Sequence, residues 1–513
     1  MMARTIMVQG TASSVGKSLL VAGLCRLLRR SGLRVAPFKS QNMALNAHVT
    51  LDGGEIGRAQ AVQAEAAGVV ATVDMNPILL KPEGDSRSQV VVLGRSVGSM
   101  SAREYHEHKP DLRRTVAECL RRLREEYDVI VIEGAGSPAE INLRERDIVN
   151  MHVARVADAP VVLVGDIDRG GVFAALVGTM ELLEPEERAR VVGLVINKFR
   201  GDMSLLQPGL DFLERRTGVP VVGVVPHIPR LRIADEDSVS LDARRRRSPA
   251  GPDELEVAVV CLPRISNYDD VLALEHEPGV VVRFVERAED IAGADLVIVP
   301  GTKSTVADLS WMRESGLASA LTQRARRGGA VVGICGGCEI LGESIEDPDH
   351  VESTEAATEG LGLLPIRTHF ERTKTTARVV ARSLSRGFFG SDVSSGARFE
   401  GYEIHMGRIT TTRSGAAAFE ITERGGRREC ADDGAVDPNG AVVGTMIHGL
   451  LEDSELRSAI LRALRRRRGL PEPTSVTRMP TRDAEYDRLA TVLGDSLDGD
   501  WLNRILGMRA MRS

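Results

Sequence analysis

Short apolar runs separated by longer amphipathic stretches dominate the first half of the chain. The runs lie at residues 4–9, 33–38, 129–133, 161–166 and 191–197. The last three are almost continuously apolar, which is typical of strands buried on both faces of a parallel sheet. Residues 17–30 have the spacing of an amphipathic helix, and further helical stretches separate the runs. This alternation predicts a doubly wound α/β domain over residues 1–242.

A second α/β pattern follows a break in composition. Residues 243–254 carry four consecutive arginines and then Pro and Gly, which predicts an exposed linker. The next strand-like runs lie at 255–262, 280–285, 296–300, 330–334 and 441–448. They predict a second domain over residues 255–455. Residues 456–513 are mostly helical in pattern and rich in Arg, which predicts a helical appendage at the C-terminus.

Composition narrows the classes of function. The 513 residues carry a net charge of -6 and only 3% aromatic residues. Neither a basic face nor a base-stacking surface is expected, which argues against a nucleic-acid partner. No apolar run approaches the roughly 20 residues of a membrane span, and the first residues do not form a signal peptide. We expect a cytoplasmic protein that has no membrane partner.

The cysteines do not suggest a disulfide framework. Six are scattered along the chain, and only Cys335 and Cys338 are close together. Such a distribution is typical of a protein in a reducing compartment. The pair has C-x-x-C spacing, but a redox or zinc site would need a thioredoxin-like context or a second pair, and the sequence shows neither.

A glycine-rich segment follows the first predicted strand and opens the first helix. It runs from Gly10 and Thr11 to Gly16, Lys17 and Ser18. Successive backbone N–H groups at a helix N-terminus suit a polyphosphate, so we expect ATP here. Lys17 is expected to reach the phosphates, and the Ser18 hydroxyl to bind Mg²⁺. Thr11 stands where the common pattern has Gly, and the glycine comes one residue earlier.

Polar residues at the ends of neighbouring strands extend this candidate site. Glu133 ends one run and leads into Gly-Ala-Gly, and Asp166 ends the next. Carboxylates there could bind Mg²⁺ or act on the γ-phosphate, although such residues also cap turns and helices. Asn197 ends the following strand, where it could bind the adenine base or serve a turn.

The second candidate site is a thiol. Cys335 follows the strand at 330–334 in a G-x-C-x-G sequence, whose small residues allow a sharp turn that exposes a nucleophile. The backbone N–H of Gly336 is placed to stabilise an oxyanion. The alternative is a buried structural cysteine in a glycine turn. His448, which follows an apolar strand, is the expected base, and His405 is its rival.

Taken together, these segments resemble the cobyric acid synthase family, in which a dethiobiotin-synthetase-like domain is fused to a class I glutamine amidotransferase domain. The resemblance covers nearly the whole chain. It rests on residues 10–18, 37–46, 133–136, 166–173, 197–202, 264–270, 300–305, 333–337 and 401–407.

The resemblance implies a specific reaction. Members of this family amidate the b, d, e and g carboxylates of adenosylcobyrinic acid a,c-diamide, with glutamine as the nitrogen source and ATP with Mg²⁺ as the activating agent. It implies that Cys335 is the nucleophile, that His448 is its base, and that the turn at Gly301 supplies the second oxyanion donor. The expected partners are therefore the corrinoid, glutamine and ATP. The sequence leaves the oligomeric state open.

Two departures from the family pattern stand out. Many class I amidotransferases have a carboxylate two residues after the catalytic histidine, and this chain has Leu450. Another group must therefore orient His448. Glu339 stands where a glutamine is usual after the nucleophile, which puts one glutamine-binding contact in question.

Two other functions remain open from the sequence. Cobyrinic acid a,c-diamide synthase has the same domains but acts on other carboxylates, and residues 41–43 and 401–407 favour cobyric acid synthase over it. A partition-type ATPase that acts as a binding switch would share the phosphate loop but would not need Cys335 or His448.

Overall fold

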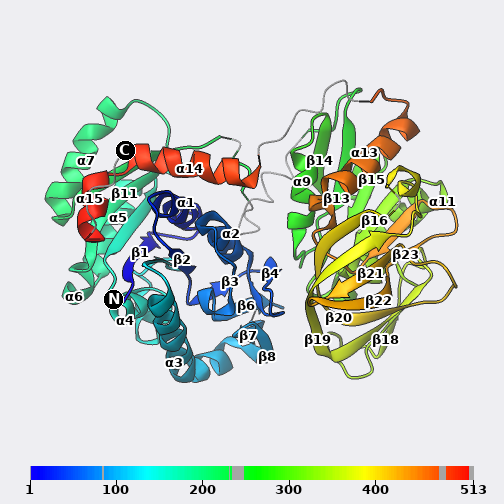
Figure 1. Cartoon of the computed structure of the whole chain (residues 1–513), viewed down its shortest axis with the longest axis horizontal. Helices are drawn as coiled ribbons and strands as arrows, with labels where there is room; N and C mark the ends of the chain where they lie inside the picture. Colours follow the sequence, from blue (N-terminus) through cyan, green and yellow to red (C-terminus); the bar gives the residue numbers. More distant parts are fainter. Residues whose placement is uncertain are drawn as a thin grey trace. The chain divides into compact units, whose positions relative to one another are not determined.

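The computed structural model describes residues 2–83, 86–229, 231–233, 248–394, 396–472 and 481–507. Residues 243–247 of the predicted linker lie outside this set. The chain divides into two compact units (Figure 1). Unit 1 contains Met1–Ala44, Glu55–Glu236 and Pro480–Ser513, and unit 2 contains Leu45–Gly54 and Asp237–Met479. Both units are α/β, as the sequence predicts.

Unit 1 is built on a six-stranded parallel sheet with the order β12-β11-β10-β1-β9-β2. Its strands are β1 (Arg4–Gly10), β2 (Val35–Phe38), β9 (Val129–Glu133), β10 (Val161–Asp166), β11 (Val191–Phe199) and β12 (Val221–Pro226). Side chains alternate between the two faces: Ile6 and Val8 join one hydrophobic cluster, and Met7 joins another. Burial on both faces explains why these strands read as continuous apolar runs.

Helices cover both faces of this sheet. They are α1 (Lys17–Arg30), α2 (Arg58–Ala67), α3 (Ala102–Glu126), α4 (Met151–Ala157), α5 (Val172–Leu182), α6 (Pro185–Arg188), α7 (Met203–Thr217), α14 (Arg482–Ser496) and α15 (Gly499–Ile505). The helix α1 begins and ends where the sequence predicts. Ser101 and Glu104 form a capping box at the start of α3, which fixes where that helix begins.

A smaller four-stranded sheet in unit 1 was not predicted. Its order is β3-β6-β7-β8, with β3 (Gln41–Met43), β6 (Ile78–Pro82), β7 (Arg87–Val92) and β8 (Arg95–Ser101). The turn between β7 and β8 is Leu93-Gly94, and both residues have positive φ. A two-residue turn of this kind matches the twist of a β-hairpin, so Gly94 was the local signal that sequence reasoning missed.

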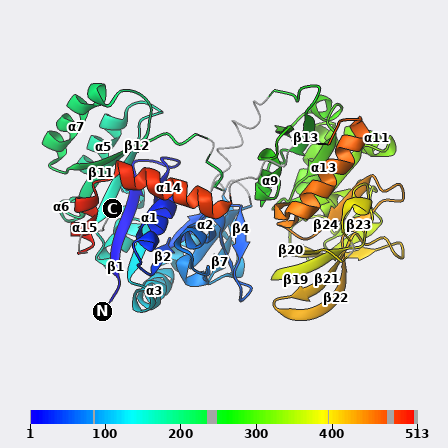
Figure 2. The ribbon, with the colours of Figure 1, turned by 45° about the horizontal axis from the view of Figure 1, so that its top comes forward.

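The predicted C-terminal appendage is not a single element. The helix α13 (Ser454–Arg468) belongs to unit 2, whereas α14 and α15 belong to unit 1. The reason is that their apolar residues join different cores: Leu456 packs in unit 2, and Leu493 and Trp501 pack in unit 1. Figure 2 shows α14 lying along α1.

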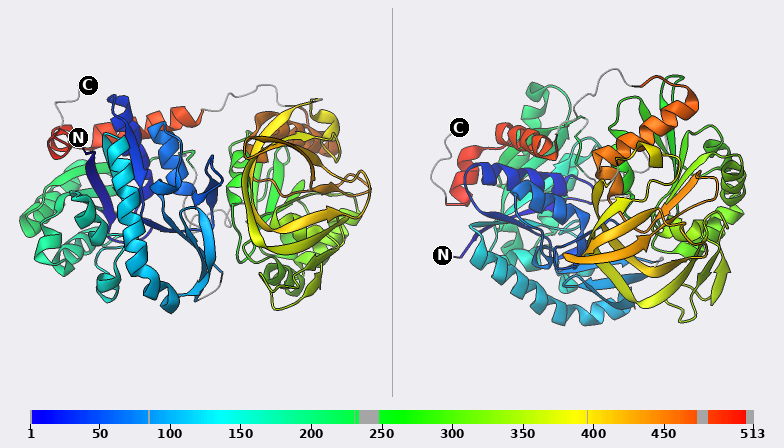
Figure 3. Two further views of the ribbon diagram at one scale, coloured as in Figure 1. Left: turned by 60° about the horizontal axis from the view of Figure 1, so that its bottom comes forward. Right: turned by 45° about the vertical axis from the view of Figure 1, so that its right-hand side comes forward.

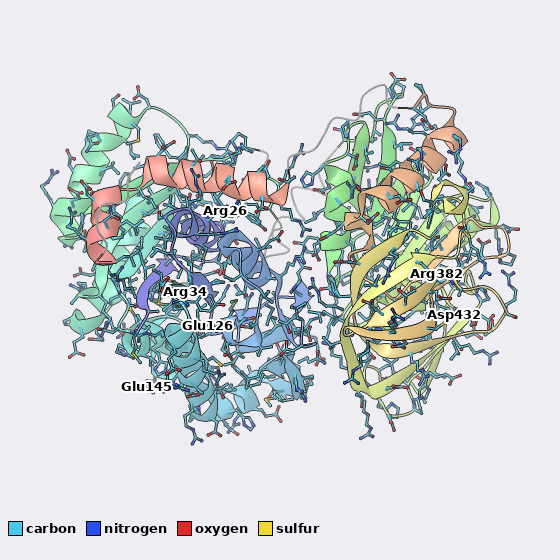
Figure 4. All side chains as sticks on the ribbon, viewed as in Figure 1. Arg26, Arg34, Glu126, Glu145, Arg382 and Asp432 are labelled. Atoms are coloured by element: carbon cyan, nitrogen blue, oxygen red, sulfur yellow. The ribbon has the colours of Figure 1, made fainter. Side chains whose placement is uncertain are left out.

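An ion-pair cluster holds α14 against α1. Arg26 of α1, which Figure 4 labels, donates to Asp487 at 2.8 and 3.0 Å and to Asp483 at 2.9 Å. Its side chain is 10% exposed, so the pairing with Asp487 takes place in partly desolvated surroundings. The C-terminal helices are therefore part of the phosphate-loop unit.

Unit 2 contains a six-stranded sheet with the order β14-β13-β15-β16-β24-β23, in which only β23 is antiparallel to its neighbour. The strands are β13 (Leu255–Val260), β14 (Val280–Val285), β15 (Leu296–Val299), β16 (Ala330–Ile334), β23 (Ala435–Val436) and β24 (Val442–Thr445). Among the described residues of this unit, the α-helices are α9 (Leu272–Glu275), α10 (Thr305–Glu314), α11 (Leu317–Arg326), α12 (Gly336–Leu341) and α13.

A second, largely antiparallel sheet completes unit 2 (Figure 3). Its strands are β17 (Ser344–Glu346), β18 (Ala357–Glu359), β19 (Ile366–Ser383), β20 (Arg398–Thr411), β21 (Phe419–Arg424) and β22 (Arg427–Asp433). The long strand β19 alternates buried and exposed residues over much of its length, because one face packs on the core. Unit 2 also includes β4 (Ala47–Val49), while β5 (Glu55–Gly57) returns to unit 1.

Within the described residues, no helix has the length and apolar character that crossing a membrane requires.

Candidate functional site

The phosphate loop of unit 1 is held in shape by the strands beside it. The Thr11 N–H donates to the carbonyl of Val164 in β10, which extends the sheet into the loop. Gly16 has a φ of 97°, in the left-handed region that favours glycine. The Asn197 amide donates to the Val15 carbonyl at 2.8 Å. These contacts fix the turn of the loop and its position beside the sheet.

Two of the three predicted magnesium ligands, Ser18 and Glu133, are adjacent. The Ser18 hydroxyl donates to Oε1 of Glu133 at 2.9 Å, and the Lys39 ammonium donates to the same oxygen at 2.9 Å. Glu133 is almost fully buried and also accepts from Gln63. A hydroxyl and a carboxylate are oxygen ligands of the kind Mg²⁺ prefers, and Mg²⁺ takes few protein ligands when phosphates complete its shell. The pair therefore fits a magnesium ion bound together with a nucleotide.

The Lys17 ammonium is hydrogen-bonded both to the phosphate loop and to the segment that follows β9. It donates to the carbonyls of Ala12 at 2.9 Å and Gly136 at 3.2 Å. Gly136 belongs to the Gly-Ala-Gly segment that follows Glu133, so the two motifs lie together as the sequence suggests. Phosphate oxygens can replace these carbonyl acceptors, because both are hydrogen-bond acceptors for an ammonium group.

Asp166 and Asn197 both make structural contacts, which the sequence left open as the alternative to ligand binding. Asp166 accepts from the Lys198 ammonium at 2.8 Å and from the Asp168 N–H at 2.9 Å. Lys198 also donates to the Ser14 carbonyl, so it ties Asp166 to the phosphate loop. Asn197 supports the loop through Val15. A metal role for Asp166 and a base-binding role for Asn197 stay predictions.

The replacement Gly16→Ala is expected to weaken ATP binding at least tenfold. A Cβ at this position would lie 2.3 Å from Nδ2 of Asn197, and the positive φ adds strain of about 1–3 kcal/mol. Titration calorimetry with MgATP measures the change. Gly178→Ala in α5 is the matched control, because a Cβ there meets nothing within 4 Å. Unchanged ATP affinity in Gly16→Ala would contradict the assignment of the loop.

Cys335 lies in a strained turn between β16 and α12. Its φ of 52° and ψ of -115° are rare for a residue other than glycine. The turn needs the flanking glycines: a Cβ on Gly337 would lie 1.9 Å from the Val299 carbonyl oxygen, and one on Gly333 would lie 2.6 Å from Leu341. The geometry is that of a nucleophile elbow, in which strain holds the side chain at the strand end.

His448 lies beside this thiol and is fully buried. Its Nδ1 lies 2.7 Å from Oδ2 of Asp270, and the other oxygen of Asp270 accepts from the Gly449 N–H at 2.6 Å. Burial alone would lower the pKa of His448, but the nearby Asp270 carboxylate and Cys335 thiol raise it to about 10. A protonated imidazole beside Cys335 stabilises the thiolate, which is the nucleophilic form.

Asp270 is a candidate site residue that sequence reasoning missed. It takes the place of the carboxylate that is absent at Leu450, but it lies 178 residues before His448 in the chain. The only signal was that it ends the segment 264–270, to which no role had been given. Asp453, which follows His448 closely, instead caps α13 by accepting from the N–H groups of Glu455 and Leu456.

The structure separates the two candidate histidines. Nδ1 of His405 lies 2.8 Å from the Gly407 carbonyl oxygen, and Nε2 lies 3.5 Å from the buried carboxylate of Glu403. Within the described residues, the Gly407 carbonyl is a hydrogen-bond partner of Nδ1, and Nε2 has no hydrogen-bond partner. His448 has the acid partner and the thiol, so it is the better candidate for the base.

The predicted oxyanion residues lie around the same thiol. A Cβ on Gly336 would lie 3.1 Å from the Thr302 nitrogen, so the turn after β15 meets the elbow there. A Cβ on Gly301 would lie 3.1 Å from Cε1 of His448. The fold therefore brings Gly301 and Gly336 together with Cys335 and His448. Their donation to an oxyanion stays a prediction.

Glu339 is buried in α12, one turn after Cys335. Its Oε2 accepts from the Thr305 hydroxyl at 2.9 Å, while its Oε1 has no hydrogen-bond partner within the described residues. Burial raises the pKa of Glu339, although His405 and the Thr305 hydroxyl oppose the rise. The departure from the usual glutamine thus places an incompletely paired acid one helical turn after Cys335.

The replacement Glu339→Gln is expected to stabilise the protein, and more so as the pH rises. A carboxyl whose pKa is raised by folding binds protons more tightly in the native state, so wild-type stability falls above the ordinary pKa of about 4.3. Glutamine does not ionise, so the variant does not lose this stability as the pH rises. Its free energy of unfolding in alkaline solution is expected to exceed that of wild type by about 1–3 kcal/mol. Urea unfolding at several pH values measures it. Glu314→Gln, at an exposed position, is the control. Equal pH dependence in wild type and Glu339→Gln would refute the explanation.

Comparisons with known proteins agree with both halves of this description. Residues 6–241 match the CobQ/CobB/MinD/ParA nucleotide binding domain, and residues 256–456 match the CobB/CobQ-like glutamine amidotransferase domain. The fold and the two sites therefore define an enzyme of the amidotransferase class in which a nucleotide-binding domain precedes a glutamine amidotransferase domain.

Relatives of nearly the same length place the chain more narrowly. It is 65% identical to a cobyric acid synthase of Sorangium cellulosum, over 99% of both chains. It is 53% identical to a cobyric acid synthase of Moorella thermoacetica, over 99% of this chain and 98% of that one. The chain belongs to the cobyric acid synthase family.

Proposed function

We propose that this enzyme converts adenosylcobyrinic acid a,c-diamide to cobyric acid by amidating the b, d, e and g carboxylates. Glutamine supplies the nitrogen, and ATP activates each carboxylate. The observation that carries the proposal is the Cys335–His448–Asp270 arrangement, in a chain that also has a formed phosphate loop. The names of the full-length relatives support the choice of substrate.

The glutaminase half follows from the geometry around Cys335. The thiolate attacks the side-chain amide carbon of glutamine, and the N–H groups of Gly336 and Gly301 stabilise the oxyanion. His448, held by Asp270, gives its proton to the leaving nitrogen, so ammonia departs and a γ-glutamyl thioester remains. Water then attacks the thioester with His448 as base, which releases glutamate and restores the thiol.

The amide-forming half follows from the phosphate loop. A corrinoid carboxylate attacks the γ-phosphate of ATP, which gives an acyl phosphate and ADP, and ammonia then displaces phosphate. Lys17 would bind the transferring phosphoryl group, and the loop N–H groups would bind the other phosphates. Ser18 and Glu133 would hold Mg²⁺, which neutralises charge on the phosphates. Activation is needed because a free carboxylate is a poor electrophile.

We further propose that ammonia passes within the enzyme to this site. Free ammonia in neutral water is mostly ammonium, which is not nucleophilic, so a sheltered transfer avoids the loss. Unlabelled ammonium salt added during turnover with ¹⁵N-amide glutamine should then leave the product fully labelled. Free dilution of the label would rule the transfer out. The reduced thiol that the mechanism requires also favours a cytoplasmic location.

Mass spectrometry of the corrinoid tests the function. The enzyme is incubated with adenosylcobyrinic acid a,c-diamide, glutamine and MgATP, and each acid-to-amide conversion exchanges OH for NH₂. The mass of the corrinoid is expected to fall by one small step at each conversion until the fully amidated product is reached. Activity only on cobyrinic acid, at its a and c carboxylates, would instead indicate a diamide synthase. ATP hydrolysis that needs neither glutamine nor corrinoid would indicate a partition-type switch.

A further inference from the structure

A buried carboxylate that neither half of the proposed reaction uses lies beside the turn after β15. Asp308 of α10 is fully buried. Its Oδ2 accepts from the Thr302 hydroxyl at 2.5 Å and from the Arg264 N–H at 3.2 Å, while its Oδ1 has no hydrogen-bond partner within the described residues. Burial raises the pKa of Asp308, although both hydrogen bonds oppose the rise. A carboxyl group buried with one oxygen unpaired costs stability, so the contacts of the other oxygen point to a role.

The Thr302 hydroxyl is fixed through both its proton and its oxygen. A hydroxyl has one proton to donate, and the Asp308 carboxylate at 2.5 Å is a closer acceptor than the Arg264 carbonyl at 3.2 Å. The hydroxyl oxygen also accepts from the Ser304 N–H at 3.0 Å. A hydrogen bond to a carboxylate is stronger than one between neutral groups. The side chain of Thr302 is therefore held in one position, and the turn with it.

The same carboxylate oxygen joins the turn to the segment beside it. The Ser266 N–H donates to the Gly301 carbonyl at 2.9 Å, and the Lys303 N–H donates to the Arg264 carbonyl at 3.0 Å. Asp308 accepts from the N–H of Arg264 on one side of this pairing and from the Thr302 hydroxyl on the other. Loss of the carboxylate would therefore loosen the turn from its neighbour.

The turn lies directly against the cysteine elbow. A Cβ on Gly336 would lie 2.7 Å from Cγ2 and 3.1 Å from the backbone nitrogen of Thr302. In a trans peptide the C=O and N–H point in opposite directions, so the Thr302 N–H points away from Ser266, which binds the Gly301 carbonyl. An oxyanion donor must lie about 2.7–3.1 Å from the oxygen that it stabilises. A small displacement of the turn would therefore take its N–H groups out of range.

We propose that Asp308 is a positioning residue for glutamine hydrolysis, which holds the turn at residues 300–303, through the Thr302 hydroxyl, where backbone N–H groups of the turn donate to the oxyanion. The tetrahedral intermediate carries a negative charge that bound glutamine does not carry. A displaced turn therefore lowers the rate of the reaction more than the affinity for glutamine. The inference rests on the proposed role of Cys335 and His448 in glutamine hydrolysis.

Four variants test the contact. Thr302→Val removes the hydroxyl but keeps the methyl group that lies beside Gly336. Thr302→Ser keeps the hydroxyl and loses that methyl group, so it is the conservative counterpart. Asp308→Ala removes the acceptor. Ser310→Ala removes an exposed hydroxyl from the same helix and is the matched control.

Glutamate release is measured in the presence of saturating MgATP and corrinoid. The kcat of Thr302→Val and of Asp308→Ala is expected to fall by about 10- to 100-fold, the effect of a donor displaced by a fraction of an ångström to 1 Å. Their KM for glutamine should stay within about twofold of wild type. Thr302→Ser and Ser310→Ala should keep a kcat close to wild type. The double variant of Thr302→Val and Asp308→Ala should be little slower than either single variant, because both changes remove the same contact.

An aldehyde analogue of glutamine reports on the oxyanion position itself. The Cys335 sulfur adds to the aldehyde carbon of glutamate γ-semialdehyde, the carbonyl electron pair moves to the oxygen, and the thiol proton completes a thiohemiacetal without a leaving group. Its inhibition constant should rise in Thr302→Val and Asp308→Ala by the factor by which kcat falls. Alkylation of Cys335 by iodoacetamide, followed by peptide mass spectrometry, forms no oxyanion, so its rate should equal that of wild type in every variant.

A wild-type kcat and semialdehyde affinity in Thr302→Val would overturn the proposal. So would a loss of kcat that is matched by slower alkylation of Cys335, or that Thr302→Ser shares in full, because either result would indicate general damage to the site. If Asp308→Ala does not fold, the two Thr302 variants decide alone. Failure of the proposed function is a separate result, in which wild type neither releases glutamate nor binds the semialdehyde at Cys335.

Discussion

Replacing Cys335 with alanine is expected to abolish amidation with glutamine and to leave amidation with ammonia intact. The thiol provides the only covalent step proposed for the glutaminase half, so its loss should lower the glutamine-dependent rate by on the order of 10⁴-fold or more. The phosphate loop lies in a different unit, and ammonia supplied at high concentration needs no thiol. Corrinoid mass spectra with glutamine and with ammonium chloride measure the two rates side by side.

Cys338 provides the matched control for this experiment. It lies three residues further on, is fully buried, and burial raises its pKa well above the ordinary value, so it is an unreactive thiol. Its Sγ packs against the backbone at Gly444, where an added Cβ would approach it to 2.6 Å. Cys338→Ala should keep glutamine-dependent activity at a modest cost in stability. Glutamine-dependent amidation that persists in Cys335→Ala would show that the nucleophile is misassigned.

Local sequence was sufficient for the elements that have a strong pattern. Val129–Glu133, Val161–Asp166 and Ala330–Ile334 are strands with the predicted bounds, because burial on both faces leaves a continuous apolar run. The phosphate loop and the cysteine elbow are equally local, since glycines at fixed positions are needed for their backbone geometry.

Features that depend on residues distant in the sequence were not predictable in this way. The pairing of Asp270 with His448 brings a short helical turn, Tyr268–Val271, next to the segment that follows β24, and no spacing rule covers such a separation. The strand β17 has three residues and β22 is exposed over most of its length, so neither has a strong alternating period. The C-terminal helices separate because each buries its apolar face on a different core, which their composition does not reveal.

The contacts of Asn197 and Asp166 show the same limit at the nucleotide site. A polar residue at the end of a parallel strand can face a ligand or support the loop that binds it. Asn197 and Lys198 donate hydrogen bonds to backbone carbonyls of the phosphate loop. Position 16 needs glycine because the Asn197 side chain occupies the space that a Cβ would take. Sequence position alone assigns these residues to the site but not to one of these two roles.

The second large effect is expected for Asp270→Asn, which should lower the glutaminase kcat by about 10²- to 10⁴-fold with little change in KM. The Asn side chain keeps the size of Asp but removes the charge that, with Cys335, raises the pKa of His448 to about 10. The imidazolium then loses its counter-ion, and the orientation of the ring is less firmly fixed. Steady-state glutamate release over a range of pH measures both effects.

Asp453→Asn is the control for charge loss near His448 in the sequence. Asp453 caps α13, and Asn is an equally good cap, so kcat and stability should both stay close to wild type. If Asp270→Asn instead retained the wild-type kcat, the orienting role of Asp270 would be excluded, whatever its effect on folding.

Wild type and Asp270→Asn should also differ in how their stability depends on pH. Folding raises the pKa of His448 from an ordinary value of about 6.5 to about 10, so the native state binds its proton more tightly than the unfolded state. The stabilisation is fully present below pH 6.5 or so and is lost as the pH rises through about 10. In Asp270→Asn the raised pKa falls back, so the stability advantage of wild type should be largest in mildly acidic solution and should vanish in strongly alkaline solution. An advantage that grew with pH would mean that His448 is neutral in the folded protein, and the thiolate of Cys335 would then need another source of stabilisation.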